Sequence, residues 1–353
     1  MDNLLIDIIV AVWNRPVESR NCLVHLIDHS PNARFILVDN GSDRDTERLL
    51  EEFAEVLDQR ALLLRNNTNQ GYVRAVNRGL SQAKAPHIAI IRNTTVVTGG
   101  WLEPMLRYSE GRSEAGIIVP RLIRGVAGKN AGNRRSADAP VEADHGSFEA
   151  MLLKKRVYET IGGIDEEMDG GIWSLKDFSR RALRAGFVTV RNEQGSAYFE
   201  DEIIFGSMER REQAVKRSIA QFREKWGVEN SYCLHFPKGA DMNILRQKVD
   251  IVLRGARQGH FFTILTHPRL HHEALQAGFH RLHEHIRFVR LPLLFENREI
   301  SKALSGGNEM DSAVRAVTGI DGMPFPLAVE SMTFAELERI ISAIHAEKYG
   351  NYS

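Results

Sequence analysis

Apolar residues in the first third of the chain fall into runs with alternating strand-like and helix-like spacing. Residues 6–13, IDIIVAVW, are rich in β-branched side chains and stop at Asn14-Arg15-Pro16, which is typical of a buried strand that meets a turn. Residues 17–29 then carry apolar side chains at helical spacing. The same order continues through RFILVDNGSD, TERLLEEFAEVLDQ, ALLLRNN, YVRAVNRGLSQAK and PHIAIIRN. This alternation predicts a mostly parallel, Rossmann-like sheet flanked by helices, the α/β fold class.

The pattern changes after about residue 115. Residues 116–123 and 149–155 read as short strands on either side of a long polar stretch, and helical patterns follow at residues 174–185 and 208–226. From about Phe236 onward helical patterns dominate, and some strand is expected only within RFVRLPLLF. We therefore expect an α/β domain over residues 1–230 and a mainly α C-terminal appendage over residues 231–353.

Composition excludes several classes of protein. The 43% hydrophobic and 26% charged residues are typical of a globular chain, and the zero net charge removes the electrostatic case for nucleic acid as a partner. The N-terminus carries no basic leader, and no segment approaches the roughly 20 apolar residues of a membrane helix, so a cytoplasmic protein without a transmembrane segment is expected. The two cysteines, Cys22 and Cys233, supply neither a disulfide framework nor a zinc spacing.

Candidate binding residues follow the predicted strands, whose carboxyl ends meet at the sheet edge where ligands of open α/β sheets bind. Asp39 offers a carboxylate that can accept hydrogen bonds from the ring N–H groups of a nucleotide base, although it could equally cap the next helix. Gly71, after Asn69-Gln70, opens a helix whose free N–H groups and missing side chain suit a nucleotide. Arg74, one turn later, could reach the base or a phosphate.

Six motifs in order make the chain resemble the family 2 glycosyltransferases over roughly residues 5–228. The motifs are VAVWNRP, LVDNGSDRDT, NQGYVRAVNRGL, IRNTTVVTGGWLEPM, IGGIDEEM and LKDFSRRALRAGF. The resemblance implies a GT-A fold and the inverting transfer of a sugar from a UDP, dTDP or GDP donor to a saccharide, lipid-linked or protein acceptor. It also implies that the donor contacts Trp13, Asn14, Asp39, Asn69, Gly71 and Arg74.

Members of that family hold Mn²⁺ or Mg²⁺ with an Asp-x-Asp motif, but the corresponding residues here are Arg92, Asn93 and Thr94. Neither end supplies an anionic ligand, so we expect no metal site and no cofactor, although the resemblance leaves Mn²⁺ or Mg²⁺ open. In one interpretation Arg92 neutralises the donor diphosphate directly, with Asn93 and Thr94 beside it, and the enzyme is metal-independent. In the other, the domain is an inactive binding or scaffolding protein.

The helix that carries the catalytic base in that family also departs from the pattern. Only Asp177 remains of its carboxylates, and pairing with Arg180 or Arg181 would give it a structural role instead. Asp165 and Glu166, on the preceding acceptor-side segment, are the other candidate bases, and they form an acidic cluster with Glu167 and Asp169.

Two further features concern partners. The polar stretch around Arg134-Arg135 lies where an acceptor cleft is expected and could bind an anionic group, and the C-terminal helices offer a surface for a homo-oligomer. We favour the enzyme over the inactive protein, because arginine in place of a metal ligand is a chemically sensible replacement. Nucleotidyl transfer is disfavoured because no glycine-rich, lysine-bearing loop follows the first strand.

Overall fold

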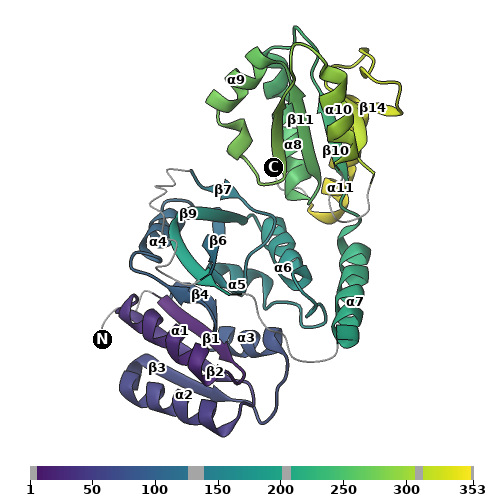
Figure 1. Ribbon diagram of the computed structural model, residues 1–353. Helices are drawn as coiled ribbons and strands as arrows, with labels where there is room; N and C mark the ends of the chain where they lie inside the picture. Colours follow the sequence, from purple (N-terminus) through teal and green to yellow (C-terminus); the bar gives the residue numbers. More distant parts are fainter. Residues whose placement is uncertain (1–5, 126–138, 201–207, 307–312, 351–353) are drawn as a thin grey trace. The chain divides into compact units, whose positions relative to one another are not determined.

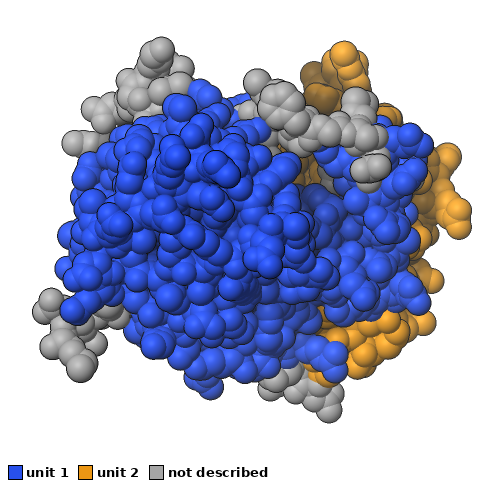
Figure 2. Space-filling view, turned by 90° about the horizontal axis from the view of Figure 1, so that it is seen from below, with its two compact units in different colours: residues 1–140, 145–225 blue, residues 141–144, 226–353 orange. Residues whose placement is uncertain are grey.

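The computed structural model describes residues 6–125, 139–200, 208–306 and 313–350, which divide into two compact units. Unit 1 comprises residues 1–140 and 145–225, and unit 2 comprises residues 141–144 and 226–353 (Figure 2). The Arg134-Arg135 pair lies outside the described residues.

A mixed sheet forms the centre of unit 1, with its strands in the order β3-β2-β1-β4-β8-β6-β9-β5 (Figure 1). Neighbours from β3 to β4 pair in parallel, whereas β8 runs antiparallel to both β4 and β6. The strands are β1 Ile6–Val12, β2 Ala33–Asp39, β3 Ala61–Arg65, β4 His87–Arg92, β5 Val96–Val97, β6 Ala115–Arg124, β8 Ala150–Lys154 and β9 Val188–Phe199. The parallel half therefore brings the carboxyl ends of β1, β2 and β4 to one edge.

Helices cover both faces of this sheet. Their bounds are α1 Pro16–Asp28, α2 Arg44–Leu57, α3 Tyr72–Leu80, α4 Glu103–Glu110, α5 Lys155–Ile161, α6 Trp173–Arg184 and α7 Met208–Trp226, with a 3₁₀ turn at Asp58–Arg60. Buried side chains of α1, α2 and α4 pack on one face, and those of α3, α5 and α6 pack on the other. The helix-covered, mostly parallel sheet expected from the sequence is thus confirmed for this unit.

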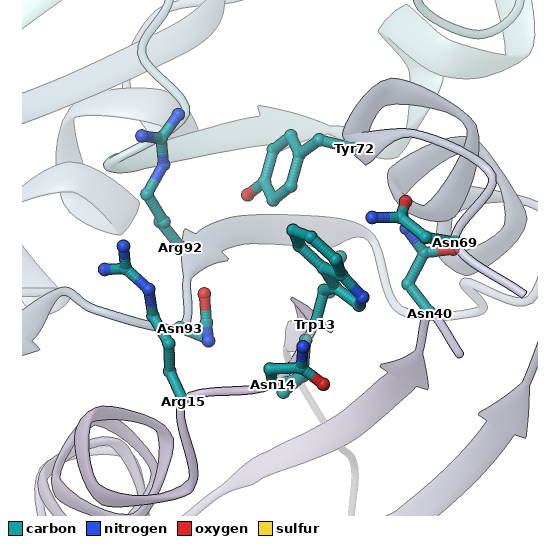
Figure 3. Close-up of a pocket in the computed structure, with 10 residues that line it drawn as sticks. Trp13, Asn14, Arg15, Asn40, Asn69, Tyr72, Arg92 and Asn93 are labelled. Atoms are coloured by element: carbon teal, nitrogen blue, oxygen red, sulfur yellow. The ribbon is translucent and has the colours of Figure 1, made fainter. Parts of the chain in front are cut away.

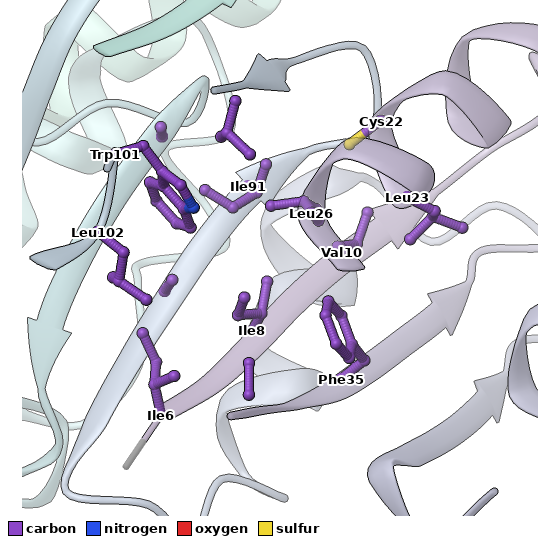
Figure 4. Packing of buried hydrophobic residues seen from close by; sticks show 14 of the residues in the cluster. Ile6, Ile8, Val10, Cys22, Leu23, Leu26, Phe35, Ile91, Trp101 and Leu102 are labelled. Atoms are coloured by element: carbon purple, nitrogen blue, oxygen red, sulfur yellow. The ribbon is translucent and has the colours of Figure 1, made fainter. Parts of the chain in front are cut away.

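The strand β1 shows why the sheet needs helices on both sides. All seven of its residues are buried, and Ile8 and Val10 face one core while Ile9 and Ala11 face the other, as the two-residue period of a strand requires. Figure 4 shows α1 covering the first of these cores, where Cys22 lies among apolar side chains. Burial raises the pKa of the Cys22 thiol to about 12, which makes it an inert core residue.

Unit 2 is built around its own five-stranded parallel sheet, with described strands in the order β12-β11-β10-β13-β14. These strands are β10 Ser231–His235, β11 Phe261–Thr266, β12 Ile286–Arg290, β13 Arg315–Thr318 and β14 Ser331–Thr333, and β7 Val141–Glu142 joins the unit from the earlier segment. Its helices are α8 Met242–Arg257, α9 Pro268–Gln276, α10 Glu296–Ser305 and α11 Phe334–Lys348, with a 3₁₀ turn at Phe279–Arg281.

The C-terminal region contains more strand than the sequence pattern indicated. Helices are present as expected, and the Thr333–Glu336 capping box begins α11. The region is nevertheless organised by a parallel sheet, and the expected strand around residues 286–290 is one member of it. Strands of three to six residues give too little two-residue periodicity to stand out from the helical pattern. None of the described helices is both long and apolar enough to cross a membrane.

Candidate functional site

A cavity of about 510 Å³ opens at the carboxyl ends of β1, β2 and β4 (Figure 3). Its lining combines two aromatic rings, two guanidinium groups and several amides, from Ala11, Val12, Trp13, Asn14, Arg15, Asn40, Asn69, Tyr72, Arg92 and Asn93. Of the residues expected to bind the donor, Trp13, Asn14, Asn69, Arg92 and Asn93 are among these, whereas Asp39, Gly71, Arg74 and Thr94 are not. Thr94 lines a separate cavity of about 340 Å³ together with Glu18 and Tyr198.

The turn after β1 presents the first group of lining residues. Asn14 and Arg15 have positive φ angles of 57° and 60°, and this left-handed pair turns the chain into α1. The side-chain oxygen of Asn14 accepts a hydrogen bond from the Asp43 N–H at 2.8 Å, and the Asn14 N–H donates to Ser42 Oγ at 3.0 Å. The turn is thereby tied to the end of β2. Trp13 stays 51% exposed, with its ring against the cavity (Figure 3).

The end of β2 is held by Asp39, the expected base reader. Its side chain is buried, and its Oδ1 accepts a hydrogen bond from the Ser42 N–H at 2.9 Å. Gly41, at φ 74°, has no room for a side chain, because a Cβ atom there would lie 2.5 Å from the Thr68 backbone. Asp39 thus shapes the turn, and the next residue, Asn40, reaches the cavity.

The buried amide of Asn40 fixes the whole loop before α3. Its Nδ2 donates to Asn69 Oδ1 at 2.9 Å and to the Gly71 carbonyl at 3.1 Å. Its Oδ1 accepts from Asn66 Nδ2 at 2.8 Å and from the Gln70 N–H at 3.1 Å. All four of these hydrogen bonds from one side chain go to the loop that forms a wall of the cavity.

The N-terminus of α3 does not stand open in the way the sequence led us to expect. The carboxylate of Asp169 accepts hydrogen bonds from the backbone N–H groups of Tyr72 and Val73. A Cβ atom on Gly71, at φ 92°, would lie 2.9 Å from Asp169 Oδ2. The missing side chain of Gly71 thus makes room for a carboxylate of the same chain, and Arg74 is paired with Glu166 at 2.8 Å.

Two guanidinium groups lie on one side of the cavity, opposite the amides of Asn40 and Asn69 (Figure 3). Arg92 extends from the end of β4, with its guanidinium carbon 5.4 Å from the centre of the Tyr72 ring and its Nη1 3.8 Å from Glu149 Oε1. Arg15 comes from the turn after β1. Asn93 is buried, and its Nδ2 donates to Ser19 Oγ at 2.9 Å, which anchors the segment after β4 to α1.

The family model of glycosyl transferase family 2 matches residues 7–175. Residues 7–175, which make up most of unit 1, are therefore similar to the family 2 glycosyltransferases. A solved structure of the enzyme GalNAc-T7 with UDP, GalNAc and Mn²⁺ superposes with a TM-score of 0.52 at 14% identity, covering 63% of this chain and 48% of that one, which confirms the GT-A fold.

Curated relatives match about a third of this chain. The glycosyltransferase GlyG of Streptococcus pneumoniae is 25% identical over 116 residues, or 33% of this chain and 38% of the relative. The rat polypeptide N-acetylgalactosaminyltransferase 13 is 35% identical over 110 residues, or 31% of this chain and 19% of the relative. The match spans less than two fifths of the length of either relative.

The three expected base candidates of the glycosyltransferase are engaged with neighbouring groups. Asp177 is fully buried, with Arg181 Nε and Lys225 Nζ each 2.7 Å from its carboxylate. Hydrogen bonds from the Asn77 amide, and then from Arg74, lower the pKa of Glu166. Asp165 accepts a hydrogen bond from its neighbour, the Glu167 N–H, at 3.0 Å.

Asp169 differs from these carboxylates. The residue as a whole is exposed, but its carboxylate lies against the first turn of α3, and this partial burial raises its pKa from 3.8 to about 6. The two backbone N–H groups and the Arg74 charge oppose the shift without cancelling it. A carboxylate with this pKa changes its charge near neutral pH, which suits acid–base chemistry.

The residues present do not fit a divalent cation. Arg92, Asn93 and Thr94 place a cation and two neutral side chains where the Asp-x-Asp ligands are expected, and Mg²⁺ or Mn²⁺ requires anionic oxygen ligands. Among the described residues, no group of three or more His, Cys, Asp or Glu side chains could hold a metal ion. The positive charge of this site belongs to arginines.

Sequence reasoning missed Arg15, Asn40 and Tyr72. They stand inside the motifs WNRP, VDNGS and NQGY, directly beside residues that were identified, so motif position was an available signal. Asp169 was identified only as a member of an acidic cluster, because its contact with α3 spans almost a hundred residues of sequence.

We expect Asn40→Ala to destabilise unit 1, because four hydrogen bonds of a buried amide are lost. The free energy of unfolding should fall by about 3 kcal/mol in urea denaturation. The matched control is Asn32→Ala in the exposed turn before β2, which should change stability by less than about 0.5 kcal/mol. Equal effects of the two substitutions would contradict the role given to Asn40.

Proposed function

We propose that the chain is an inverting glycosyltransferase that transfers a sugar from a nucleotide-sugar donor to a hydroxyl acceptor without a metal ion. The observation that supports this most directly is the pair of guanidinium groups, Arg15 and Arg92, lining the same side of a cavity at the end of β4. A guanidinium forms bidentate hydrogen bonds to phosphate oxygens and keeps its charge at any physiological pH. Two of them match the two negative charges on the diphosphate of an intact nucleotide sugar.

The remaining lining residues suit the nucleoside. The ring of Trp13 offers a surface on which a base can stack, and the amides of Asn40 and Asn69 offer both donors and acceptors opposite the arginines. The GalNAc-T7 structure contains UDP, so a UDP donor is the first choice, with dTDP and GDP donors as the alternatives. The acceptor class, cytoplasmic location and homo-oligomerisation stay predictions from the sequence.

For the proton of the acceptor hydroxyl we propose Asp169 as the general base, in preference to Asp165, Glu166 and Asp177. Asp177 is neutralised by two cations, and Glu166 is made less basic by Asn77 and Arg74. Asp169 accepts a hydrogen bond from the backbone of Tyr72, a residue that lines the cavity, and its pKa of about 6 is near the optimum for proton transfer at neutral pH.

The proposed step is a single displacement. The acceptor oxygen forms its bond to the anomeric carbon while the bond from that carbon to the phosphate oxygen breaks, and the electron pair leaves with the nucleoside diphosphate. The acceptor proton passes to Asp169. Arg15 and Arg92 stabilise the charge that grows on the leaving group, and a preformed cationic site of this kind contributes to the rate because it needs no reorganisation during the reaction.

We expect Arg92→Ala to weaken UDP binding about 30-fold, the loss of roughly 2 kcal/mol from a charge-assisted hydrogen bond. Isothermal titration calorimetry with UDP should give the same wild-type affinity in EDTA and in Mn²⁺. Arg107→Ala, which removes an exposed arginine from α4, is the matched control and should bind like wild type. Binding that requires Mn²⁺ would contradict the direct role of arginine, and binding without any turnover would favour the inactive binding protein.

We expect the kcat/KM of the wild type to fall as pH drops below about 6, because the proposed base must be ionised and its pKa is raised to about 6. Asp169→Asn should lower kcat about 100-fold or more. Because the pKa of Asp169 is raised from 3.8 to about 6 in the folded protein, the folded state loses stability when this carboxyl ionises over that pH range. The Asp169→Asn variant carries no such charge, so its melting temperature at pH 7.5 should be no lower than that of the wild type.

The control for this prediction is Glu167→Gln, an exposed carboxylate of the same segment, which should keep the wild-type rate and pH profile. Release of nucleoside diphosphate from UDP-sugars measures both variants. If Asp169→Asn unfolds the protein or retains its turnover, the carboxylate is a structural helix cap and the assignment fails.

A further inference from the structure

We propose that Glu149 contacts the sugar of the donor and restricts the enzyme to sugars that carry no acidic group. This inference rests on the proposed function. It goes beyond that function by naming the class of donor sugar and the side chain that selects it.

The sheet places Glu149 directly opposite Arg92. In the antiparallel pair β4–β8, Ile91 lies opposite Ala150, so the next residues outward on the two strands are Arg92 and Glu149. The Arg92 N–H donates to the Glu149 carbonyl at 3.3 Å, and the two side chains approach to 3.8 Å between Nη1 and Oε1. A carboxylate on β8 is thereby fixed beside the cation expected to bind the donor diphosphate.

The position of the sugar follows from the covalent structure of the donor. A nucleotide sugar carries its sugar on the terminal phosphate, on the far side of the diphosphate from the nucleoside. The nucleoside side of the cavity is formed by Asn40 and Asn69, and the arginines lie on the other side (Figure 3). The sugar therefore extends past the arginines, and Glu149 is the side chain that borders Arg92 there.

The surroundings of Arg92 have the chemistry of a sugar site. The Tyr72 ring lies on one side of its guanidinium group, and this ring meets Phe148 edge-on with a 5.0 Å separation of ring centres. Aromatic rings pack against the C–H face of a sugar, while a carboxylate accepts hydrogen bonds from its hydroxyl groups. An aromatic ring and a carboxylate therefore both lie next to the Arg92 side chain.

The Glu149 carboxylate is held in one orientation and still has hydrogen-bonding capacity for a ligand. The buried Ser147 hydroxyl donates a short hydrogen bond to Oε2, which leaves Oε1 on the Arg92 side. The 3.8 Å separation from Nη1 is longer than a hydrogen bond, and the side chains of Glu149 and Arg92 keep 26% and 23% of their surface exposed. An ionised carboxylate accepts about four hydrogen bonds, so Glu149 retains capacity for a ligand.

Charge then decides which sugars fit. A neutral hexose offers hydroxyl donors to the carboxylate, whereas a uronic acid brings a second negative charge to the same place. Two like charges about 4 Å apart repel by roughly 1 to 4 kcal/mol, between the limits of bulk water and a protein surface. That range corresponds to a preference of at least about fivefold for the neutral sugar.

The experiment compares two donors that differ only at carbon 6. Competition calorimetry measures the affinities of UDP-glucose and UDP-glucuronic acid, with UDP alone as the reference; if GDP binds the protein more tightly than UDP, GDP-mannose and GDP-mannuronic acid replace them. We expect the wild type to favour the neutral sugar at least fivefold. In Glu149→Gln, which removes the charge and keeps the shape, the ratio should approach one.

Glu55→Gln, an exposed carboxylate on α2, is the matched control and should keep the wild-type ratio. An unchanged ratio in Glu149→Gln, or a wild type that does not distinguish the two donors, overturns the assignment. Equal weakening of both donors and of the diphosphate would show that Glu149 only positions Arg92, and also overturns it. If neither UDP nor GDP binds, the proposed function itself fails, which is a distinct result.

Discussion

The candidate site depends first on the buried amide of Asn40. This residue follows the last residue of β2, where a parallel strand must end and the chain must turn, and it directs its amide at the loop before α3 rather than at solvent. An amide has both donors and an acceptor, so one side chain can hold a loop whose groups are of both kinds. With that loop fixed, Asn69 and Tyr72 lie opposite the turn after β1 and the cavity exists.

The second constraint is electrostatic. A site for a diphosphate needs positive charge, and a metal ion held by carboxylates is one way to supply it. In the function proposed above, arginines supply the charge, and the neighbouring carboxylates then have a different role. A metal site would require them as ligands, whereas an arginine site needs them spaced so that they orient the cations without neutralising them fully, and the 3.8 Å separation of Glu149 from Arg92 fits that requirement.

The segment between residues 162 and 177 shows how carboxylates of one short stretch acquire different properties. Glu166 receives hydrogen bonds from Asn77 and Arg74, and Asp177 is enclosed with Arg181 and Lys225. Asp169 accepts hydrogen bonds from backbone N–H groups at the start of α3, but these do not offset the rise in its pKa that partial burial causes. From the sequence Glu166 and Asp169 read as members of one acidic cluster, because the groups that separate their pKa values come from the distant helix α3.

The sequence by itself determined the α/β alternation, the parallel half of the first sheet, the resemblance to a family and half of the cavity lining, because these follow from local periodicity and from motifs a few residues long. Only the tertiary structure decided which residues meet across long separations. The cap of α3 by Asp169, the pair of Arg92 with Glu149, and the parallel sheet of unit 2 all depend on packing between distant segments. Short buried strands and single charged residues carry no periodic signal, so their partners are fixed only when the chain folds.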